Sequence, residues 1–497
     1  MHYFLGLDIG SSSVKVALVN ASDGTHIGVV QQPETEMAID APQAGWAEQH
    51  PEDWWYHVCK GISKIKTAYD ISEKDIVGIG IAYQMHGLVL VDDKGHVLQK
   101  SIIWCDGRAV KIGEQTLLGL GDDYCKQHLL NAPGNFTASK LRWVLENEPE
   151  NYRRISKFML PGDYIAYRLS GSINSTISGM SEGIFWDFKN NRISEELMDY
   201  LDIERHMVPE LVNTFSVQSL VSNQGAKESG LMEGTPILYR AGDQPNNALA
   251  LNVLNTGEVA ATGGTSGVMY AVTGNLQVEE YDKVNNFAHV NYDFKSEPKI
   301  GKLLCINGAG IQYRWLLNHL SVGSYEEMNQ LASEVEVGSD GVSILPFGNG
   351  PERIFKNKDI GTRIVNLNLN RHHKGHLCRA ALEGIAFAFV HGFEIMQNDG
   401  IVPKVIRAGN DNLFRSAIFS TTIATLIRKE IDIYDTTGAV GAARACIIHS
   451  CGYQEFSSFV GNDYSMTYVP NIKKEPYIKA YGLWKEELYR IIKNETH

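Results

Sequence analysis

Apolar runs of strand length alternate with longer amphipathic segments along the whole chain, which predicts an α/β protein. The first two runs, residues 3–9 and 14–20, are joined by a glycine and three serines, and this arrangement is typical of a β-hairpin. A turn at residues 22–24 leads into a third strand at residues 26–32. The next segment begins a helix at Pro51, because proline suits the first helical turn.

The same alternation continues through the middle and the end of the chain. Residues 74–87 predict a buried strand that ends in a polar loop, and residues 89–98 predict another hairpin. A further strand is expected at residues 236–240. Residues 376–396 are apolar on several faces, which indicates a helix in the interior of the protein.

A second copy of the opening pattern lies close to the midpoint of the chain. Residues 257–274 again predict a strand, a turn rich in glycine and hydroxyl side chains, and a second strand. The two halves of the chain therefore share a sequence pattern. Such turns present backbone N–H groups and hydroxyls that can bind phosphates. Neither copy is a Walker loop, because the G-x-x-x-x-G-K-[ST] pattern is absent. Taken singly, each is equally well explained as an ordinary hairpin turn.

Two aspartates stand at the ends of predicted strands, beside these turns. Asp8 ends the first apolar run, where a buried carboxylate needs a cation or hydrogen bonds, and Asp243 follows the strand at residues 236–240. One such carboxylate can hold Mg²⁺ while another accepts a proton from an attacking hydroxyl, as phosphoryl transfer requires. Taken by itself, Asp243 is also explained as a residue that caps a turn, without a role in catalysis.

Composition narrows the class of protein. The 497 residues are 43% hydrophobic and 21% charged, and this length predicts more than one domain. A net charge of -13 argues against a nucleic-acid partner. Seven cysteines without a C-x-x-C pair favour reduced thiols, and with no leader or long apolar run the sequence predicts a cytoplasmic protein without a membrane partner. The sequence does not determine the oligomeric state, and a homodimer stays an open alternative.

Eight segments in order resemble the FGGY carbohydrate kinases, and within that family the xylulokinase branch. They are LGLDIGSSSVKV, GWAEQHPEDWW, YQMHGLVLVDDKGHVLQKSIIWCDGRA, LPGDYIAYRLSG, AGDQPNNA, TGGTSGV, LEGIAFA and GAVGAARA. The resemblance implies a two-domain actin/hexokinase-like fold, each domain built on a ribonuclease H-like sheet, with the active site in the cleft between domains. We expect an N-terminal domain at residues 1–245 and a C-terminal domain at residues 246–497.

The resemblance also implies roles for individual residues. Asp243 is expected to be the catalytic base and Asp8 the residue that organises Mg²⁺, and both are candidate metal ligands. Residues expected to contact ATP are Ser11, Ser12, Lys15, Gly264, Thr265, Ser266, Gly310, Gly409 and Asn410. Residues expected to bind the sugar are Gln84, Met85, His86, Trp104, Asp106, Arg108 and Asp243.

Some of these residues also have simpler interpretations. Lys15 fits the solvent-facing position of an alternating strand, and Met85 and Trp104 fit the core. The chain also departs from the family pattern at the expected adenine turn, where Gly409 is followed by Asn410 and Asn412.

Two further segments bear on the site. Asp243 is followed by Pro245, Asn246 and Asn247 where relatives carry small residues, which predicts a stiffer, more polar loop. The histidines at residues 372–376 lack neighbouring Cys or Asp ligands, so surface or capping roles are favoured over a metal site.

The expected activity is the ATP-dependent, Mg²⁺-assisted phosphorylation of D-xylulose to D-xylulose 5-phosphate. Alternatives within the family are kinases of L-xylulose, ribulose, gluconate or glycerol. An alternative of another class is a non-catalytic actin-like protein that binds sugar or nucleotide as a regulator. The presence of Asp8, Asp243 and both phosphate turns argues against that alternative.

Overall fold

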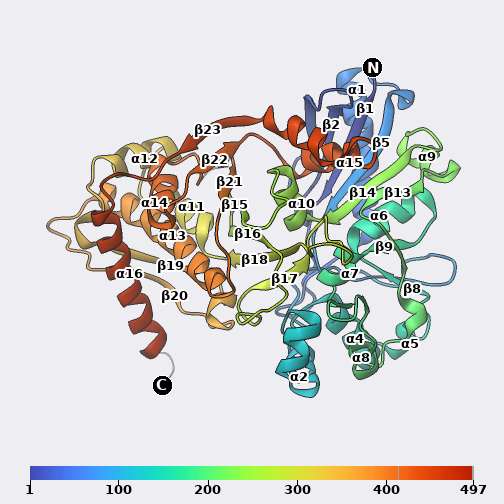
Figure 1. Cartoon of the computed structure of the whole chain (residues 1–497), viewed down its shortest axis with the longest axis horizontal. Coiled ribbons are helices and arrows are strands. Elements are labelled where there is room, and N and C mark those ends of the chain that lie inside the picture. Colours follow the sequence, from blue (N-terminus) through green and yellow to red (C-terminus); the bar gives the residue numbers. More distant parts are fainter. Residues whose placement is uncertain (412, 495–497) are drawn as a thin grey trace.

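A computed structural model describes residues 1–411 and 413–494. Two large β-sheets lie side by side, one in each half of the chain, with helices packed around them (Figure 1). The predicted two-domain α/β architecture is confirmed. None of the helices in the described part of the chain is long and apolar enough to cross a membrane.

The first sheet has the strand order β13-β14-β5-β1-β2-β3. The hairpin β1–β2 continues antiparallel into β3, whereas β5 and β14 run parallel to β1 on its other side. The strands predicted at the start of the chain and before Asp243 are therefore present. The strand bounds are β1 Tyr3–Ile9, β2 Val14–Asn20, β3 His26–Gln32, β5 Ile76–Tyr83, β13 Phe215–Leu220 and β14 Pro236–Gly242.

The second sheet repeats this topology and adds one strand, β17, at one edge, in the order β17-β18-β16-β15-β21-β22-β23. Here the hairpin β15–β16 continues antiparallel into β18, and β21 and β22 run parallel to β15. The duplication inferred from the two glycine- and hydroxyl-rich turns is thus a duplication of the sheet. The strand bounds are β15 Glu258–Gly263, β16 Gly267–Thr273, β17 Asn285–Ala288, β18 Ile300–Ile306, β21 Val405–Gly409, β22 Ile431–Tyr434 and β23 Tyr464–Tyr468.

Helices pack on both sheets, and short strand pairs add to each half, four in the first and β19–β20 in the second. The α-helices are α1 Pro51–Tyr69, α2 Val110–Leu120, α3 Asp122–Tyr124, α4 Thr137–Asn147, α5 Pro149–Tyr152, α6 Pro161–Ser170, α7 Ile177–Glu182, α8 Glu195–Tyr200, α9 Asn223–Ser229, α10 Asp243–Ala250, α11 Ala309–His319, α12 Tyr325–Ser333, α13 Lys374–Asn398, α14 Ala417–Ile427, α15 Gly438–Gly461 and α16 Glu475–Asn494. The short strands are β4 Glu48–Gln49, β6 Val89–Val91, β7 Ser101–Ile102, β8 Lys157–Met159, β9 Asn174–Thr176, β10 Trp186–Asp187, β11 Arg192–Ile193, β12 Glu210–Val212, β19 Ser343–Phe347 and β20 Gly361–Val365.

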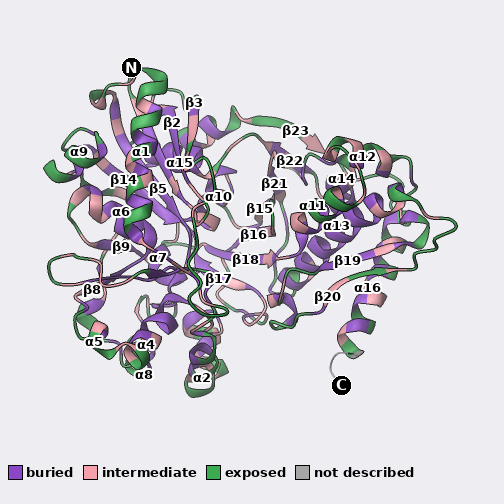
Figure 2. Cartoon of the chain, turned by 180° about the vertical axis from the view of Figure 1, so that it is seen from behind, coloured by how far each residue is buried: buried purple, intermediate pink, exposed green. Residues whose placement is uncertain are grey.

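Two sequence predictions about local structure are tested by these elements. The apolar segment at residues 376–396 lies inside α13, which is buried along most of its length, as predicted (Figure 2). The hairpin predicted at residues 89–98 forms only in part. Its first strand, β6, pairs with β8 from elsewhere in the chain, and its second half makes a single bridge between Val91 and Val97.

Helix α15 belongs to the second half in sequence but packs on the first sheet (Figure 1). Strand β1 therefore has two covered faces: Leu5 and Leu7 join the core beneath α1, while Phe4 joins the core beneath α15. The close approach of α15 requires glycine, because a Cβ at Gly6 would lie 1.9 Å from the Ala439 carbonyl oxygen and one at Gly80 would lie 1.9 Å from that of Ala442. The domain boundary at residue 245 stays a prediction.

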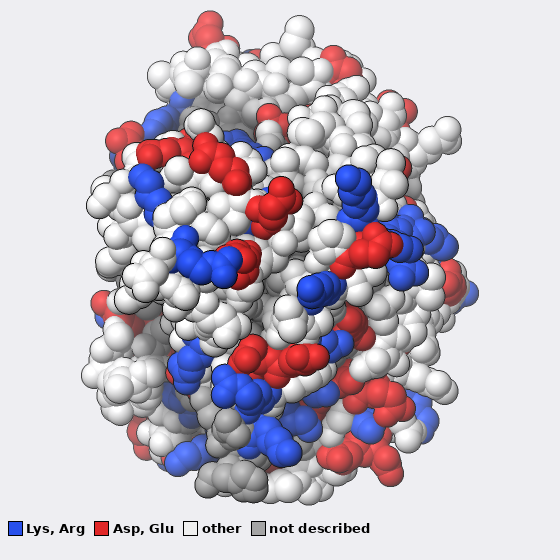
Figure 3. All heavy atoms as spheres, turned by 90° about the vertical axis from the view of Figure 1, so that its left-hand side faces the viewer, with Lys and Arg blue, Asp and Glu red and all other residues white. Residues whose placement is uncertain are grey.

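Charges of both signs are interspersed on the face formed by the second half of the chain (Figure 3). Lys and Arg side chains gather toward the lower part of this face, with Asp and Glu side chains beside them.

A buried ion pair joins the two halves through a chain of polar contacts. Lys302 Nζ lies 3.0 Å from Asp399 Oδ2, both side chains are inaccessible to solvent, and Lys302 also donates to Asn286 Oδ1. Asn286 in turn exchanges hydrogen bonds with Asn131 of the first half. Burial lowers the pKa of Lys302, whereas the charge of Asp399 raises it.

We expect Lys302→Met to lower the free energy of unfolding by about 3–5 kcal/mol, because it leaves the Asp399 carboxylate buried without its cation. Denaturant titration would measure the loss. The matched control is Lys64→Met, which breaks the exposed pair with Glu34 and should change stability by less than about 1 kcal/mol. Equal effects of the two substitutions would contradict a stabilising role for the buried pair.

Candidate active site

The two predicted catalytic aspartates lie at the same edge of the first sheet. Asp8 is on β1, and Asp243 is the first residue of α10, directly after β14. Because β1, β5 and β14 are parallel neighbours, their carboxyl ends meet there. Burial raises the pKa of Asp8, while the charge of Lys15 lowers it. Burial, and then the charge of Asp8, raises the pKa of Asp243 to about 7. The two carboxyl groups are therefore close enough to influence each other.

Lys15 lies on β2 directly across the hairpin from Asp8. It is partly buried rather than fully exposed, and its charge acts on the Asp8 carboxyl. The alternative of an ordinary solvent-facing lysine is therefore the weaker interpretation of this residue.

The N-terminus of α15 contacts both aspartate-bearing segments. A Cβ at Gly438 would lie 2.7 Å from Asp8 Oδ2 and 3.0 Å from Asn247 Oδ1, so only glycine fits at this position. Asn246 donates to the Gly438 carbonyl at 2.9 Å. The segment after Asp243, predicted as a stiff polar loop, is in fact helix α10. Its two asparagines contact the N-terminus of α15 at Gly438. The positive end of the α15 dipole favours negative charge here.

The pair of aspartates fits Mg²⁺ bound in the company of a nucleotide. No group of three or more His, Cys, Asp or Glu side chains that could hold a metal ion occurs among the described residues. Mg²⁺ in phosphoryl-transfer sites keeps several waters and is held by one or two carboxylates together with substrate phosphates. Asp8 and Asp243 supply such carboxylates, and both are partly buried, in surroundings that disfavour an isolated negative charge.

His86 follows β5, the strand between β1 and β14. Its backbone is in the left-handed region, with φ of 61°, and its ring Nδ1 lies 2.9 Å from the carbonyl oxygen of Glu182. Because that carbonyl only accepts, Nδ1 carries the proton and Nε2 is left as an acceptor. Burial, and then the charge of Lys140, lowers the pKa of His86 to about 3. The ring is therefore neutral. Phe136 and Phe287 pack against it with centroids 4.9 and 5.4 Å away.

Gln84 and Met85 are buried behind this surface. Gln84 Nε2 donates to Gln49 Oε1 at 3.3 Å, and Gln49 donates to the Ser11 carbonyl at 2.7 Å. Gln84 thus connects the loop after β5 to the first phosphate turn, and its own Oε1 has no partner. Met85 packs close to Gly242, the residue before Asp243. Met85 is therefore a buried core residue that also lies next to the segment that carries the candidate catalytic residue Asp243.

Trp104, Asp106 and Arg108 lie in the next loop and differ in their surroundings. The Trp104 ring is half exposed, and its Nε1 lies 3.4 Å from Ser11 Oγ. Asp106 has no exposed surface, and both of its carboxylate oxygens accept hydrogen bonds from Arg108, with Ala47 N–H as a further donor. Arg108 also stacks on Trp46 at 3.8 Å. We interpret Asp106 and Arg108 as supports of the loop, because Asp106 has no free oxygen for a hydroxyl.

Lys140 is a buried residue of this site that the sequence analysis missed. Its Nζ donates to the carbonyls of His86 and Ile103 at 2.8 and 2.9 Å, and so it joins the two loops that carry the sugar candidates. Burial lowers the pKa of Lys140 to about 7, while the charge of Asp106 raises it. A lysine within the amphipathic helix α4 gave no signal of burial. Glu182, in the buried α7, was missed for the same reason.

The candidate phosphate residues lie at two matching hairpin turns, one in each of the two large sheets. Ser11 and Ser12 form the β1–β2 turn, which Gly10 N–H closes by donating to the Ser13 carbonyl. Gly264, Thr265 and Ser266 form the matching β15–β16 turn. Part of that second turn lines a cavity of about 60 Å³. The residues around the cavity are Gly264, Thr265, Gly310, Tyr313, Arg314, Tyr325 and Leu413.

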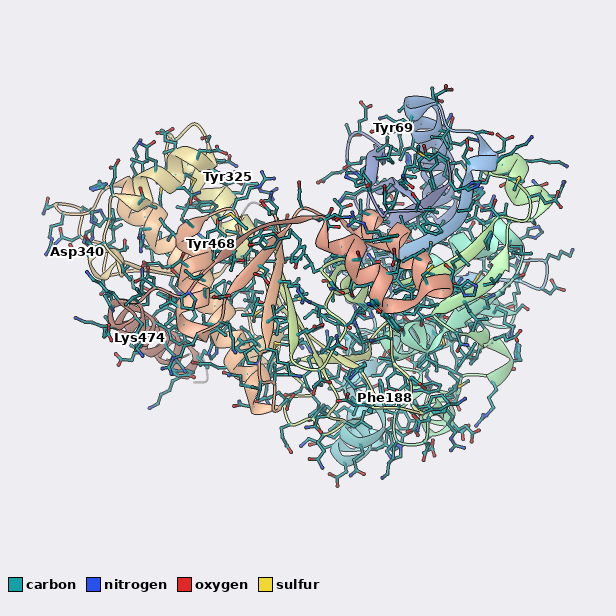
Figure 4. All side chains as sticks on the ribbon, turned by 45° about the horizontal axis from the view of Figure 1, so that its top comes forward. Tyr69, Phe188, Tyr325, Asp340, Tyr468 and Lys474 are labelled. Carbon is teal, nitrogen blue, oxygen red and sulfur yellow. The ribbon has the colours of Figure 1, made fainter. Side chains whose placement is uncertain are left out.

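Gly310 permits close contact within this part of the site. A Cβ there would lie 2.0 Å from the Gly264 carbonyl oxygen. Tyr325, at the start of α12, can be found in Figure 4 on the second half of the molecule. The structure therefore places Gly310 beside the turn of residues 264–266.

Gly409 and Asn410 end strand β21, next to β15. The space beside Gly409 is open, and Asn410 N–H donates to the Tyr434 carbonyl at 2.9 Å. The following residue, Asp411, accepts from Gly263 N–H at 2.6 Å and so ties this turn to the second phosphate turn. Asn412, which also departs from the family pattern, lies outside the described residues.

The histidines at residues 372–376 are capping residues, as the sequence indicated. His373 accepts from Gly375 N–H at the start of α13, and His376 accepts from His373 N–H. His372 Nδ1 accepts from Asn368 N–H.

Comparison with known proteins agrees with this geometry. Residues 3–250 match the FGGY family of carbohydrate kinases, N-terminal domain, and residues 259–449 match the C-terminal domain of that family. A protein named xylulose kinase from Bacillus subtilis (strain 168) is 28% identical over 440 residues, covering 86% of this chain and 85% of the relative.

Solved structures show the same fold over nearly the whole chain. The xylulose kinase from Rhodospirillum rubrum has a TM-score of 0.86 at 25% identity and covers 99% of both chains. The gluconate kinase from Lactobacillus acidophilus has a TM-score of 0.87 at 20% identity, covering 99% of this chain and 98% of its own, and this likeness concerns the fold alone. With both family domains matched in order across most of its length, the chain belongs to the FGGY family of carbohydrate kinases and is a carbohydrate kinase.

Proposed function

We propose that this kinase transfers the γ-phosphoryl group of ATP to a terminal hydroxyl of D-xylulose, giving D-xylulose 5-phosphate and ADP. The observation that carries the proposal is that Asp8, Asp243 and the loop with His86 lie at the same edge of the first sheet, at the ends of the neighbouring strands β1, β14 and β5. The name of the Bacillus subtilis relative, xylulose kinase, supports a xylulose as the acceptor.

The reaction requires a base close to the attacking hydroxyl. Asp243 accepts the proton of that hydroxyl as its oxygen forms a bond to the γ-phosphorus, and the bond from phosphorus to the oxygen that bridges to the β-phosphate breaks. A base with a pKa near 7 is well matched to this task. Mg²⁺, held by Asp8 and Asp243 with the phosphates, would neutralise charge on the nucleotide. Ser11, Ser12 and Lys15 would contact the transferring group.

The sugar would occupy the surface between the His86 loop and Trp104. Neutral His86 offers its Nε2 to a sugar hydroxyl, and the aromatic rings cover C–H surfaces. We propose that the two halves close on the substrates, which excludes water and suppresses wasteful hydrolysis of ATP. A cytoplasmic location and a homodimer stay predictions.

L-xylulose, ribulose, gluconate and glycerol are the alternative acceptors within the family. A non-catalytic regulator is the remaining alternative. Consumption of ATP that depends on added sugar would exclude it, whereas sugar binding without turnover would support it.

We expect D-xylulose to give the highest kcat/KM among D-xylulose, L-xylulose, D-ribulose, L-ribulose, gluconate and glycerol, by about tenfold or more over its epimers. A misplaced hydroxyl leaves a buried polar group of the pocket unpaired, at a cost of about 1–3 kcal/mol. His86→Ala should reduce kcat/KM for D-xylulose more than for the epimers. A clear preference for gluconate or glycerol would contradict the proposed substrate and leave the kinase chemistry intact.

A further inference from the structure

Glu182 lies between the two segments that carry the base and the candidate sugar ligands. It is the last residue of α7 and is only 1% exposed. Its Oε1 accepts from His86 N–H at a long 3.5 Å. A Cβ at Gly242 would lie 2.3 Å from its Oε2 and 2.6 Å from Met85 Cγ. The carboxyl group therefore lies between the residue that precedes Asp243 and the loop that carries His86.

The Glu182 carboxyl has little to stabilise a negative charge. It forms no ion pair within the part of the chain that the structure describes, and its one hydrogen bond is at the limit of length. The charged side chains nearby are bound to other partners. Lys140 donates to two backbone carbonyls, and Asp163 is paired with Arg240 at 2.8 Å. Burial, and then the charge of Asp243, raises the pKa of Glu182 well above its usual value.

A ligand hydroxyl would supply the partner that the protein lacks here. Buried carboxyl groups are strongly destabilised unless they are hydrogen-bonded or paired, and a hydroxyl donates to a carboxylate in a short, charge-assisted bond. Asp243 is the base for the reacting hydroxyl, so the neighbouring carboxyl is placed for a different hydroxyl of the same acceptor. The free Nε2 of His86 then accepts a hydrogen bond from a third hydroxyl of the sugar.

We propose that Glu182 is a specificity-determining residue that binds a non-reacting hydroxyl of the acceptor sugar. This proposal rests on the proposed kinase function and narrows its substrate class. A carboxylate accepts from hydroxyls but repels another carboxylate, so this residue favours a neutral ketose or polyol over a sugar acid. Together with His86 it recognises the arrangement of hydroxyls beyond the reacting one.

The test compares Glu182→Gln with the parent enzyme in steady-state kinetics. We expect the KM for D-xylulose to rise about tenfold to a hundredfold while the KM for ATP stays within about twofold. The ratio of kcat/KM for gluconate to that for D-xylulose should rise about tenfold. Thermal unfolding should occur at the same or a higher temperature, because the substitution removes a buried charge without a partner. Calorimetric titration with D-xylulose in the absence of nucleotide should show the same weakening.

The matched control is Glu383→Gln in the second half of the chain. Glu383 is equally buried, but it binds Arg379 and the Gly338 N–H. This variant should unfold at a lower temperature and keep the parent KM for D-xylulose. An unchanged sugar KM in Glu182→Gln, or a loss of thermal stability like that of the control, would overturn the proposal.

The outcome can be separated from failure of the proposed function. If the parent enzyme prefers another neutral acceptor, the assignment of D-xylulose fails, and the same comparison is made with that acceptor. Weakened binding of that acceptor by Glu182→Gln would still support the role of Glu182. A parent enzyme that prefers gluconate would overturn both.

Discussion

Asp243→Asn should lower kcat by roughly a hundredfold to ten-thousandfold, because asparagine has nearly the same size but cannot accept the proton of the attacking hydroxyl. The KM for the sugar should change much less, since the amide keeps most hydrogen bonds. Single-turnover measurements of phosphoryl transfer with D-xylulose and ATP would show the loss in the chemical step. Near-parental turnover would mean that Asp243 has a structural role.

The comparison variant for Asp243 is Asp163→Asn, because Asp163 is another buried carboxylate of the first half whose pKa is raised by burial. It pairs with Arg240 at 2.8 Å and accepts from Leu160 N–H, so its role is structural. We expect Asp163→Asn to lower thermal stability with little effect on kcat in the folded protein. Asp243→Asn should do the reverse, because it removes an unfavourable buried charge.

The parts of the site that the sequence predicted are those carried by local patterns. An apolar run, a glycine- and hydroxyl-rich turn and a second apolar run define a hairpin within some twenty residues, so both phosphate turns and the strands beside Asp8 and Asp243 could be placed. The roles of those residues came from the family resemblance. Local patterns alone left each turn and each aspartate with an ordinary structural explanation.

The parts that the sequence did not predict depend on contacts between distant segments. Helix α15 packs on a strand that lies more than 400 residues earlier, and no local pattern indicates which sheet it covers. Lys140 and Glu182 lie on helices, where a charged residue normally indicates a solvent-facing position. Their burial results from the packing of α4 and α7 against the His86 loop, which only the tertiary structure shows.

The Asp106–Arg108 pair shows a different limit of sequence reasoning. The residue types suit hydroxyl recognition, and the family segment places them next to Trp104. The fold instead directs Arg108 between two tryptophans and uses every oxygen of Asp106 within the protein. Residue type and spacing therefore predicted which loop carries these residues, whereas only the tertiary structure shows that the side chains of Asp106 and Arg108 are buried while Trp104 is half exposed.

Asp8→Ala should reduce kcat/KM for ATP by roughly a hundredfold to a thousandfold, because it removes one of two carboxylates that would hold Mg²⁺ and leaves Lys15 without its opposite charge. Binding of D-xylulose in the absence of nucleotide should stay within about threefold, since the sugar residues lie in the loops after β5 and β7. Titration of MgATP and of D-xylulose by calorimetry would separate the two effects. The control is Asp93→Ala, an exposed aspartate, which should leave both unchanged.

Folding is the competing explanation for any loss in Asp8→Ala, because Asp8 contacts the N-terminus of α15 through Gly438. Asp8→Asn keeps the volume of the side chain and its contact with α15 but has no charge. If Asp8 organises Mg²⁺, both variants lose MgATP use and Asp8→Asn keeps the parental unfolding temperature. If Asp8 only supports the packing of α15, Asp8→Asn keeps MgATP use, and Asp8→Ala loses sugar binding and thermal stability together.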